Sequence, residues 1–203
     1  GTLLGDGSLS KTVELSIGLK EEYILDNLVL PKNCIFTKFY DHKKNYIRVK
    51  FKNIEGGKST LKKELKDLGL LGTNSYNKFI PKIYLTSSIL NRKKLLEGLI
   101  DTDGYINQRG LFEYSTVSEQ LYLDFIELCR SLGIQVNGRK KERKINSSYS
   151  NKPIYFVSQL KGYKNGIKIK NIEKLNKKVE MQCIKVSNKN HLYISNDYLP
   201  THN

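Results

Sequence analysis

Two short segments of the chain end in the same way. GTLLGDG occupies residues 1–7 and GLIDTDG occupies residues 98–104, and each reads glycine, four residues, aspartate, glycine. Three pairs of residues take equivalent places in the two segments: Gly1 and Gly98, Gly5 and Thr102, and Asp6 and Asp103. Small residues four positions apart share one face of a helix and let two helix backbones approach closely. We therefore expect two helices that pack together, with Asp6 and Asp103 side by side at their C-terminal ends.

Paired aspartates at such a position favour a metal site. One aspartate followed by glycine more often only ends a helix or forms a turn, but two copies at the same point of a repeated unit favour a functional pair. Their mutual repulsion adds to the negative end of the helix dipole, and a divalent cation relieves it. Oxygen ligands with room for water suit Mg²⁺, which can activate water against a phosphodiester. Asp6 and Asp103 are thus predicted as catalytic metal ligands for Mg²⁺, with Mn²⁺ as a substitute.

The order of predicted elements is repeated along the chain. The first half predicts alternating strands over 8–19, a helix over 21–30, strands over 34–40 and 46–51, and a helix over 59–72. The second half predicts a helix over 87–104, a strand pair over 105–115, a helix over 118–133, and strands over 134–144 and 154–160. Short β-like runs follow, QCIKV at 182–186 and HLYI at 191–194. The repeated order indicates an internal duplication.

Composition restricts the class of partner. Lysine and arginine total 35 against 20 acidic residues, a formal charge of +15, which favours a polyanion such as nucleic acid or a membrane surface. No apolar run approaches the roughly 20 residues that span a bilayer, and no signal peptide is evident, so nucleic acid is preferred. The three cysteines, Cys34, Cys129 and Cys183, are widely spaced, which argues against a disulfide framework and predicts a cytoplasmic protein.

Positive charge is spread over both halves. Residues 1–94 carry a net charge of +9 and residues 95–203 a net charge of +6, with the densest tracts on predicted strands. A single charged run is usually a solvated face, but two tracts at equivalent places in a repeated unit fit one strand surface laid on DNA. The candidate DNA-binding residues are Lys11, Lys38, Arg48, Lys50, Lys52, Arg109, Arg139, Lys141 and Arg143.

Several segments in order resemble the LAGLIDADG homing endonucleases. LEGLIDTDG at 96–104 is similar to the motif that names the family, and LGDGSL at 4–9 is similar to the first copy in two-motif members. KFIP at 78–81 and YSTVSEQLYLDFIELCRSLGI at 114–134 resemble the blocks before and after the second motif. Glu97 departs from the usual alanine, and we expect it on a helix flank.

The resemblance implies an α+β fold with two pseudo-symmetric αββαββα halves, 1–94 and 95–172, whose strands form a DNA-binding saddle. It implies a monomer that cuts double-stranded DNA at a long recognition site, with Asp6 and Asp103 on the metals. Lys78 is implied as a catalytic basic partner, and Lys161 is the candidate for a second catalytic lysine. The alternative is a relative that binds DNA without cutting it, or a maturase-like protein that binds RNA.

The chain ends in HLYISNDYLPTHN. An asparagine amide can attack its own carbonyl and cleave the following peptide bond, and a neighbouring histidine can polarise that carbonyl. The stretch from Cys183 to Asn203 resembles the C-terminal blocks of inteins, the Hint-type self-splicing elements, which predicts a β-rich splicing segment over 173–203. The resemblance implies that Asn203 cyclises, that His202 assists, and that His191 and Cys183 help to resolve the branched intermediate.

From residues alone, His191 reads equally well as a histidine at the start of a buried strand, and a terminal His-Asn pair as a plain polar tail. The chain begins at Gly1 rather than at methionine, so we expect a fragment or a processed product. The resemblance to inteins implies a missing N-terminal intein segment and the flanking exteins as partners, besides DNA.

Overall fold

The computed structural model describes residues 1–203 except 11, 58, 144–151, 163–170, 181 and 203. It divides into two compact units, Gly1–Leu160 and Lys161–Asn203. Both motif segments lie in the first unit. The finer bounds expected from the sequence, 1–94, 95–172 and 173–203, stay predictions.

The first half of the first unit holds a four-stranded antiparallel sheet of order β1-β2-β4-β3. Its strands are β1 (Gly7–Leu9), β2 (Val13–Gly18), β3 (Cys34–Asp41) and β4 (Tyr46–Asn53). Its helices are α1 (Thr2–Gly5), the 3-10 turn η1 (Leu19–Glu21), α2 (Tyr23–Asp26), α3 (Thr60–Asp67) and α4 (Lys82–Leu85).

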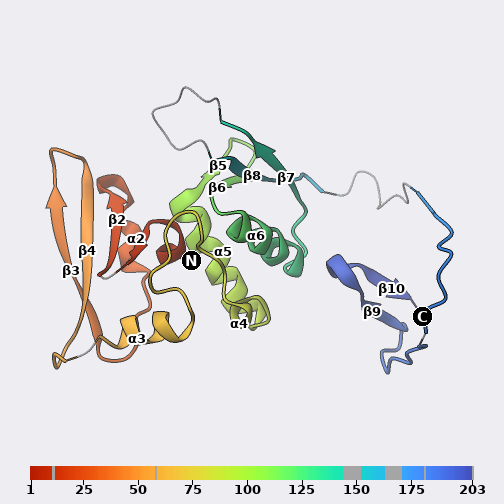
Figure 1. Cartoon of the computed structure of the whole chain (residues 1–203). Coiled ribbons are helices and arrows are strands. Elements are labelled where there is room, and N and C mark those ends of the chain that lie inside the picture. Colours follow the sequence, from red (N-terminus) through yellow and green to blue (C-terminus); the bar gives the residue numbers. More distant parts are fainter. Residues whose placement is uncertain (11, 58, 144–151, 163–170, 181, 203) are drawn as a thin grey trace. The chain divides into compact units, whose positions relative to one another are not determined.

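The second half has the same topology. Its strands are β5 (Gly104–Ile106), β6 (Phe112–Thr116), β7 (Val136–Lys141) and β8 (Ile154–Gln159), in the antiparallel order β5-β6-β8-β7. Its helices are α5 (Ile89–Asp103) and α6 (Glu119–Ser131). Figure 1 shows α5 in the middle of the unit, with one sheet on each side. Because each half places its third and fourth strands in reversed order, the expected duplication and the mixed α+β class are confirmed.

Two expected helices differ from the pattern. The helix expected over 21–30 is reduced to η1 and α2, because the side chain of Asn27 donates to the carbonyl oxygen of Tyr23 at 3.1 Å and competes with the next helical turn. The helix expected to close the second half is not seen over 171–180, and residues 163–170 lie outside the described residues.

Serine side chains begin the longer helices. The hydroxyl oxygens of Ser59, Ser88 and Ser118 each accept a hydrogen bond from a backbone N–H in the first turn, which satisfies a donor that the helix leaves free. The helix starts expected from the sequence, near residues 59 and 87, agree with the caps at Ser59 and Ser88. Gly133, with φ +73°, follows the end of α6 in the left-handed conformation that glycine tolerates.

Alternation along the strands buries one face of each sheet. In the first sheet Leu15, Ile17, Ile47 and Val49 are at most 2% exposed and pack with the buried side chains of α2. In the second sheet Tyr114 and its neighbours pack on α6, where the ring of Tyr114 stacks on Phe125 with centroids 3.9 Å apart. Burial of each such side chain stabilises the fold by about 1.5–3 kcal/mol. The opposite face of each sheet carries the polar residues.

The second unit contains a β-hairpin. β9 (Leu192–Ile194) pairs antiparallel with β10 (Pro200–His202), and the 3-10 turn η2 (Asn196–Tyr198) connects them. The strand expected at 182–186 is absent, because this stretch pairs with no strand in the described part of the chain. Within that same part, no helix is long and apolar enough to cross a bilayer.

Candidate active site

The two motif helices meet at their backbones. A Cβ atom placed on Gly98 would lie 2.8 Å from the backbone nitrogen of Thr2, and one placed on Gly1 would lie 2.7 Å from Cα of Gly98. One turn further on, a Cβ on Gly5 would lie 2.6 Å from Cβ of Thr102. Real side chains do not tolerate such approaches, so glycine is needed where α1 crosses α5. The predicted packing of the two helices is confirmed.

The glycine after each aspartate has a related steric role. A Cβ on Gly7 would lie 2.8 Å from Cα of Leu3, and one on Gly104 would lie 2.7 Å from Cα of Ile100. Each contact is with the last turn of the helix that the glycine follows. The chain can therefore pass without a loop from α1 into β1 and from α5 into β5, which puts Asp6 and Asp103 at the two junctions.

Asp6 and Asp103 are both held where a negative charge is unfavourable. Burial, then the charge of Asp103, then that of Glu21, raise the pKa of Asp6 from 3.8 to about 6. Burial also raises the pKa of Asp103. A Cβ on Gly5 would lie 3.2 Å from Oδ2 of Asp103, so this carboxylate reaches the first motif helix. A cation placed between the two carboxylates would relieve both penalties.

Lys78 lies beside this pair. It is 6% exposed, and its ammonium donates to the carbonyl oxygens of Gly5 at 2.7 Å and Gly7 at 2.8 Å, on either side of Asp6. Burial lowers the pKa of Lys78, while the charges of Asp103 and Asp6 oppose that shift. The structure thus brings together three of the residues predicted from the sequence. Lys161 differs, since it is an exposed residue at the first position of the second unit.

The donor set at the aspartate pair suits a hard divalent cation. Mg²⁺ is usually bound by one or two carboxylates, several waters and the phosphates of a substrate. No group of three or more His, Cys, Asp or Glu side chains that could hold a metal occurs among the described residues. Asp6 and Asp103 would therefore be the protein ligands, and the remaining positions would be left to water and phosphate.

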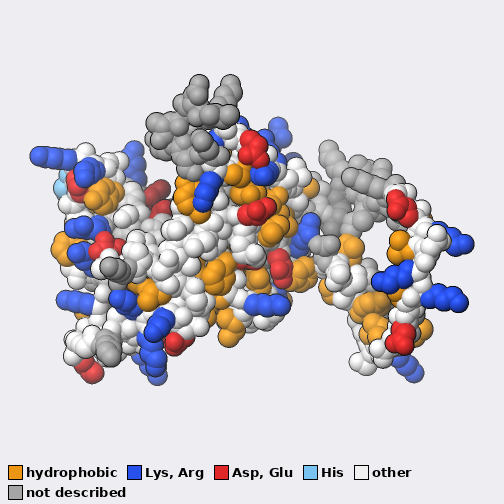
Figure 2. Space-filling view, in the orientation of Figure 1, with side chains coloured by type: hydrophobic (Ala, Val, Ile, Leu, Met, Phe, Trp, Pro, Cys, Tyr) orange, Lys and Arg blue, Asp and Glu red, His pale blue; other side chains and the backbone are white. Residues whose placement is uncertain are grey.

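The polar face of the first sheet carries a basic row. Arg48, Lys50 and Lys52 are exposed and alternate along β4 with its buried residues. Phe39, opposite Arg48 in the strand register, lies 5.9 Å from that guanidinium and 5.6 Å from the ammonium of Lys50. Figure 2 shows Lys and Arg side chains along the side of the molecule where Figure 1 has β3 and β4. Lys38 is not in this row, because it pairs with Val49 in the register and faces the helix side, where it bonds Glu22 at 2.8 Å.

The second sheet has a corresponding but shorter set. Arg139 and Lys141 share one face of β7, and the guanidinium of Arg139 lies 4.9 Å from the ring centroid of Phe156, its partner in the register. Arg109 is exposed in the turn between β5 and β6, and Arg143 is half-buried just after β7. Lys11 lies outside the described residues.

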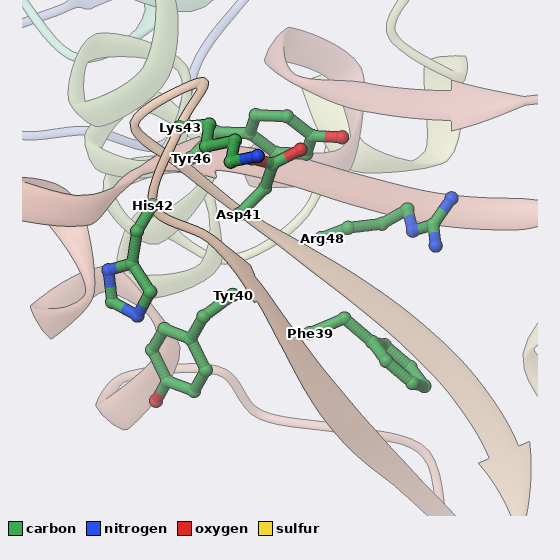
Figure 3. Close-up of a pocket in the computed structure, with 7 residues that line it drawn as sticks. All are labelled: Phe39, Tyr40, Asp41, His42, Lys43, Tyr46 and Arg48. Carbon is green, nitrogen blue, oxygen red and sulfur yellow. The ribbon is translucent and has the colours of Figure 1, made fainter.

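A shallow pocket of about 430 Å³ lies at the tip of the β3–β4 hairpin. Figure 3 shows Tyr40 and His42 on one side of β3, and Phe39 on the other side near Arg48. The rings of Tyr40 and His42 stack with centroids 6.0 Å apart. The lining residues are Phe39, Tyr40, Asp41, His42, Lys43, Tyr46 and Arg48. Phe39 and Arg48 connect this pocket to the basic row, whereas Tyr40 belongs to the helix side, where its hydroxyl bonds Glu22.

The C-terminal hairpin brings two predicted residues together. The rings of His191 and His202 are 6.1 Å apart with an interplanar angle of 69°. His191 is exposed and has φ +52°, so it is not the buried core histidine that was the alternative interpretation. Cys183 is also exposed, and Asn203 lies outside the described residues.

Sequence reasoning missed two residues next to the site. Ser118 is 0% exposed and Asp124 is 6% exposed, and both bond the backbone of the segment that carries Lys78. Asp124 lies on the apolar stripe of α6, between Leu121 and Phe125. An acidic residue on a buried helix face is the sequence signal that could have revealed it.

The fold and the site define a duplicated α+β protein with an aspartate pair at the crossing of two helices. A family model described as "Homing endonuclease" matches residues 79–183, more than half of the 203 residues. The chain belongs to the homing endonuclease family.

Two individual proteins are similar to the chain. "Replicative DNA helicase DnaB" of Mycobacterium intracellulare is 31% identical over an alignment of 169 residues, and the match covers 71% of this chain. The chain spans 28% of the length of that curated relative. A solved structure described as "Structures and dynamics of mesophilic variants from the homing endonuclease I-DmoI" has a TM-score of 0.47 and 8% identity, and the match covers 79% of this chain and 84% of the other.

Proposed function

We propose that this protein makes a site-specific double-strand break in DNA by metal-dependent phosphodiester hydrolysis, as a LAGLIDADG-type endonuclease. The observation that carries the proposal is the placement of Asp6 and Asp103 at the ends of two helices in backbone contact, with Lys78 beside them. Mg²⁺ held by the two aspartates would supply activated water and stabilise the leaving oxygen.

Asp6, Asp103 and Lys78 would have different roles in the reaction. Asp6 and Asp103 would hold the cation, one aspartate coming from each half. Lys78 places a positive charge next to the site and stabilises the negative charge that develops on the attacked phosphate. Its hydrogen bonds to Gly5 and Gly7 fix the junction that carries Asp6.

The basic rows of the two sheets would bind the duplex. Arg48, Lys50 and Lys52 in the first half and Arg139 and Lys141 in the second lie on polar strand faces, where each neutralised phosphate releases counterions. Two such sheets in one chain suit a monomer that covers a long recognition site. Lys38, which is paired with Glu22 on the other face, is left out of this surface.

We further propose that the C-terminal segment belongs to an intein. The edge-to-face contact of the His191 and His202 rings supports a splicing site in which Asn203 cyclises, with Cys183 as a further participant. The chain matches only 28% of the length of its helicase relative. Such a partial match is expected when an intein is embedded in a larger host protein. The N-terminal splicing segment and the exteins would then be partners within the precursor.

The nuclease proposal is tested with plasmids that carry intein-less alleles of replicative helicase genes. The chain, expressed within its full natural gene product, is expected to linearise such a plasmid with Mg²⁺ or Mn²⁺. Asp6→Asn and Asp103→Asn should each abolish linearisation, while Asp101→Asn, a change at an exposed position of the same motif helix, should retain it. Tight binding of a site without cleavage in either metal would instead support the DNA-binding alternative.

A further inference from the structure

The segment that carries Lys78 has no regular secondary structure, although Lys78, Ile80 and Pro81 are buried and Ile80 belongs to the hydrophobic core. Residues 78–81 belong to no helix or strand, and the backbone N–H of Lys78 bonds only back to the preceding turn, at the carbonyl oxygen of Asn74. Packing alone supplies no partners for the backbone polar groups of residues 78 and 80, and buried N–H and C=O groups are almost always hydrogen-bonded. The backbone therefore needs support from hydrogen-bond partners if Lys78 is to keep one position against Gly5 and Gly7.

Two side chains of α6 supply that support. The hydroxyl of Ser118 donates to the backbone carbonyl oxygen of Lys78 at 2.6 Å, and the carboxylate of Asp124 accepts from the backbone N–H of Ile80 at 2.7 Å. The two bonds fix the backbone at Lys78 and at Ile80. The other oxygen of Asp124 accepts from the side chain of Gln120 at 2.8 Å, which fixes the carboxylate.

The cost of burial argues that Asp124 has a specific role. An acid that is 6% exposed, set between Leu121 and Phe125 on the apolar stripe of α6, loses most of its hydration. An apolar residue would pack there at lower cost, since buried polar groups seldom stabilise a fold as well as hydrophobic ones of similar size. What the carboxylate adds is a fixed acceptor for one particular backbone N–H.

We propose that Ser118 and Asp124 are positioning residues that hold Lys78 at the first motif helix. They touch neither aspartate of the pair, and they act through the 78–80 backbone. We call the two hydrogen bonds from Ser118 and Asp124 to the 78–80 backbone the clamp. Since α6 belongs to the second half and Gly5 and Gly7 to the first, the clamp fixes one half of the duplicated site against the other. The effect of this clamp on cleavage rests on the proposed nuclease function. Its effect on the position of Lys78 is independent of that function.

The clamp is tested first without DNA. The full protein is trace-labelled with an amine-acetylating reagent at fixed pH, and acetylation of Lys78 is followed by mass spectrometry relative to the exposed Lys82. Ser118→Ala and Asp124→Ala are expected to speed labelling of Lys78 about tenfold, because each removes a buried hydrogen bond. Asp124→Asn keeps an acceptor oxygen and should stay close to wild type. If Asp124→Ala does not fold, the comparison rests on Ser118→Ala.

Ser131→Ala is the matched control. The Ser131 hydroxyl donates to the carbonyl oxygen of Leu128 at 2.7 Å in the same helix and makes no bond to 78–80. Its loss should leave labelling of Lys78 unchanged. Because Ser118 also caps α6, Asp124→Ala, which leaves that cap in place, separates loss of the cap from loss of the support at residues 78–80. Equal labelling rates in folded Ser118→Ala and wild type would overturn the proposal.

Cleavage provides the second readout. In single turnovers at saturating protein, Ser118→Ala should slow cleavage about tenfold while its Kd for the same DNA stays within about twofold, because misplaced catalytic groups slow chemistry without loss of binding. A loss confined to Kd, or equal slowing in Ser131→Ala, would contradict a positioning role. If wild type cuts no DNA, the proposed function fails, and the labelling experiment still decides the clamp.

Discussion

The ammonium of Lys78 lies 2.7 Å from the carbonyl oxygen of Gly5, across 73 positions of the sequence. This bond joins the segment before α5 to the end of α1, so the two motif helices are linked by a buried charge as well as by their glycines. The helix crossing, the acidic pair, the basic surface and the C-terminal hairpin can each be altered separately by substitution.

The helix crossing predicts a steric penalty at Gly98. Gly98→Val should lower the free energy of unfolding by at least about 1–3 kcal/mol, because its side chain would overlap the backbone of Thr2. Denaturant titration measures the change. The neighbouring Glu97→Ala is the control, since Glu97 is exposed and pairs only with Lys94 on the helix surface, which predicts a change within about 0.5 kcal/mol. Equal losses in both variants would contradict backbone contact at this point.

The acidic pair predicts a specific pH dependence in the absence of divalent metal. The pKa of Asp6 is about 6 in the folded protein against an ordinary 3.8, so the folded state binds this proton more tightly. Its contribution to stability is therefore present below 3.8 and is lost as the pH rises through about 6. Asp6→Asn has no titrating carboxyl at this position and so lacks this contribution. Comparison with wild type therefore isolates the contribution of Asp6.

The measurement is the free energy of unfolding of wild type minus that of Asp6→Asn, by denaturant titration with chelator present. This difference should fall between about pH 4 and pH 6 and become level above pH 7. A difference that increases over the same interval would mean that the Asp6 carboxylate is stabilised in the folded state, contrary to its placement beside Asp103.

The two faces of the first sheet predict different effects on DNA binding. Arg48→Ala should weaken binding to a duplex and reduce the slope of log K against log salt by about 1, because it removes one phosphate contact. Lys38→Ala removes the same charge from the opposite face, where Lys38 is engaged with Glu22, and should leave the slope unchanged. Fluorescence anisotropy over a salt series distinguishes them. Equal slopes for the two variants would show that the polar face does not bind DNA.

The C-terminal hairpin predicts cleavage at its end. In a precursor with the N-terminal splicing segment and a following Cys, Ser or Thr, Asn203→Ala should abolish C-terminal cleavage, because no side-chain amide remains to attack the carbonyl. His202→Ala should slow cleavage about 10²-fold or more, as expected for a lost proton donor. Gel analysis of the products with time measures both. Unchanged cleavage in Asn203→Ala would remove the splicing assignment.

Much of the site could be predicted because its signals are local. The glycines and aspartates of the two motifs are read directly from spacing, and the alternation of Ile47 and Val49 with Arg48 and Lys50 fixes the faces of β4. These patterns depend on backbone period alone, which the sequence displays in full.

What could not be predicted depends on contacts between distant residues. Lys38 was placed with the basic residues of β4, but its face follows from its pairing with Val49, which strand composition does not reveal. Asp124 holds Ile80 across 44 positions, and nothing in the local pattern of α6 identifies its partner. The shortened α2 reflects one side-chain bond of Asn27, which competes with helix propensity.

The proposal that Asp6 and Asp103 bind divalent metal jointly is tested most directly by NMR with Mn²⁺. In a titration of ¹⁵N-labelled protein, the amide signals of Gly7 and Gly104, which follow the two aspartates, should broaden together and before others. Excess Mg²⁺ should reverse the broadening, and either Asp6→Asn or Asp103→Asn should prevent it at both amides. Broadening that begins elsewhere, or that persists at one glycine when the other aspartate is replaced, would contradict a shared site.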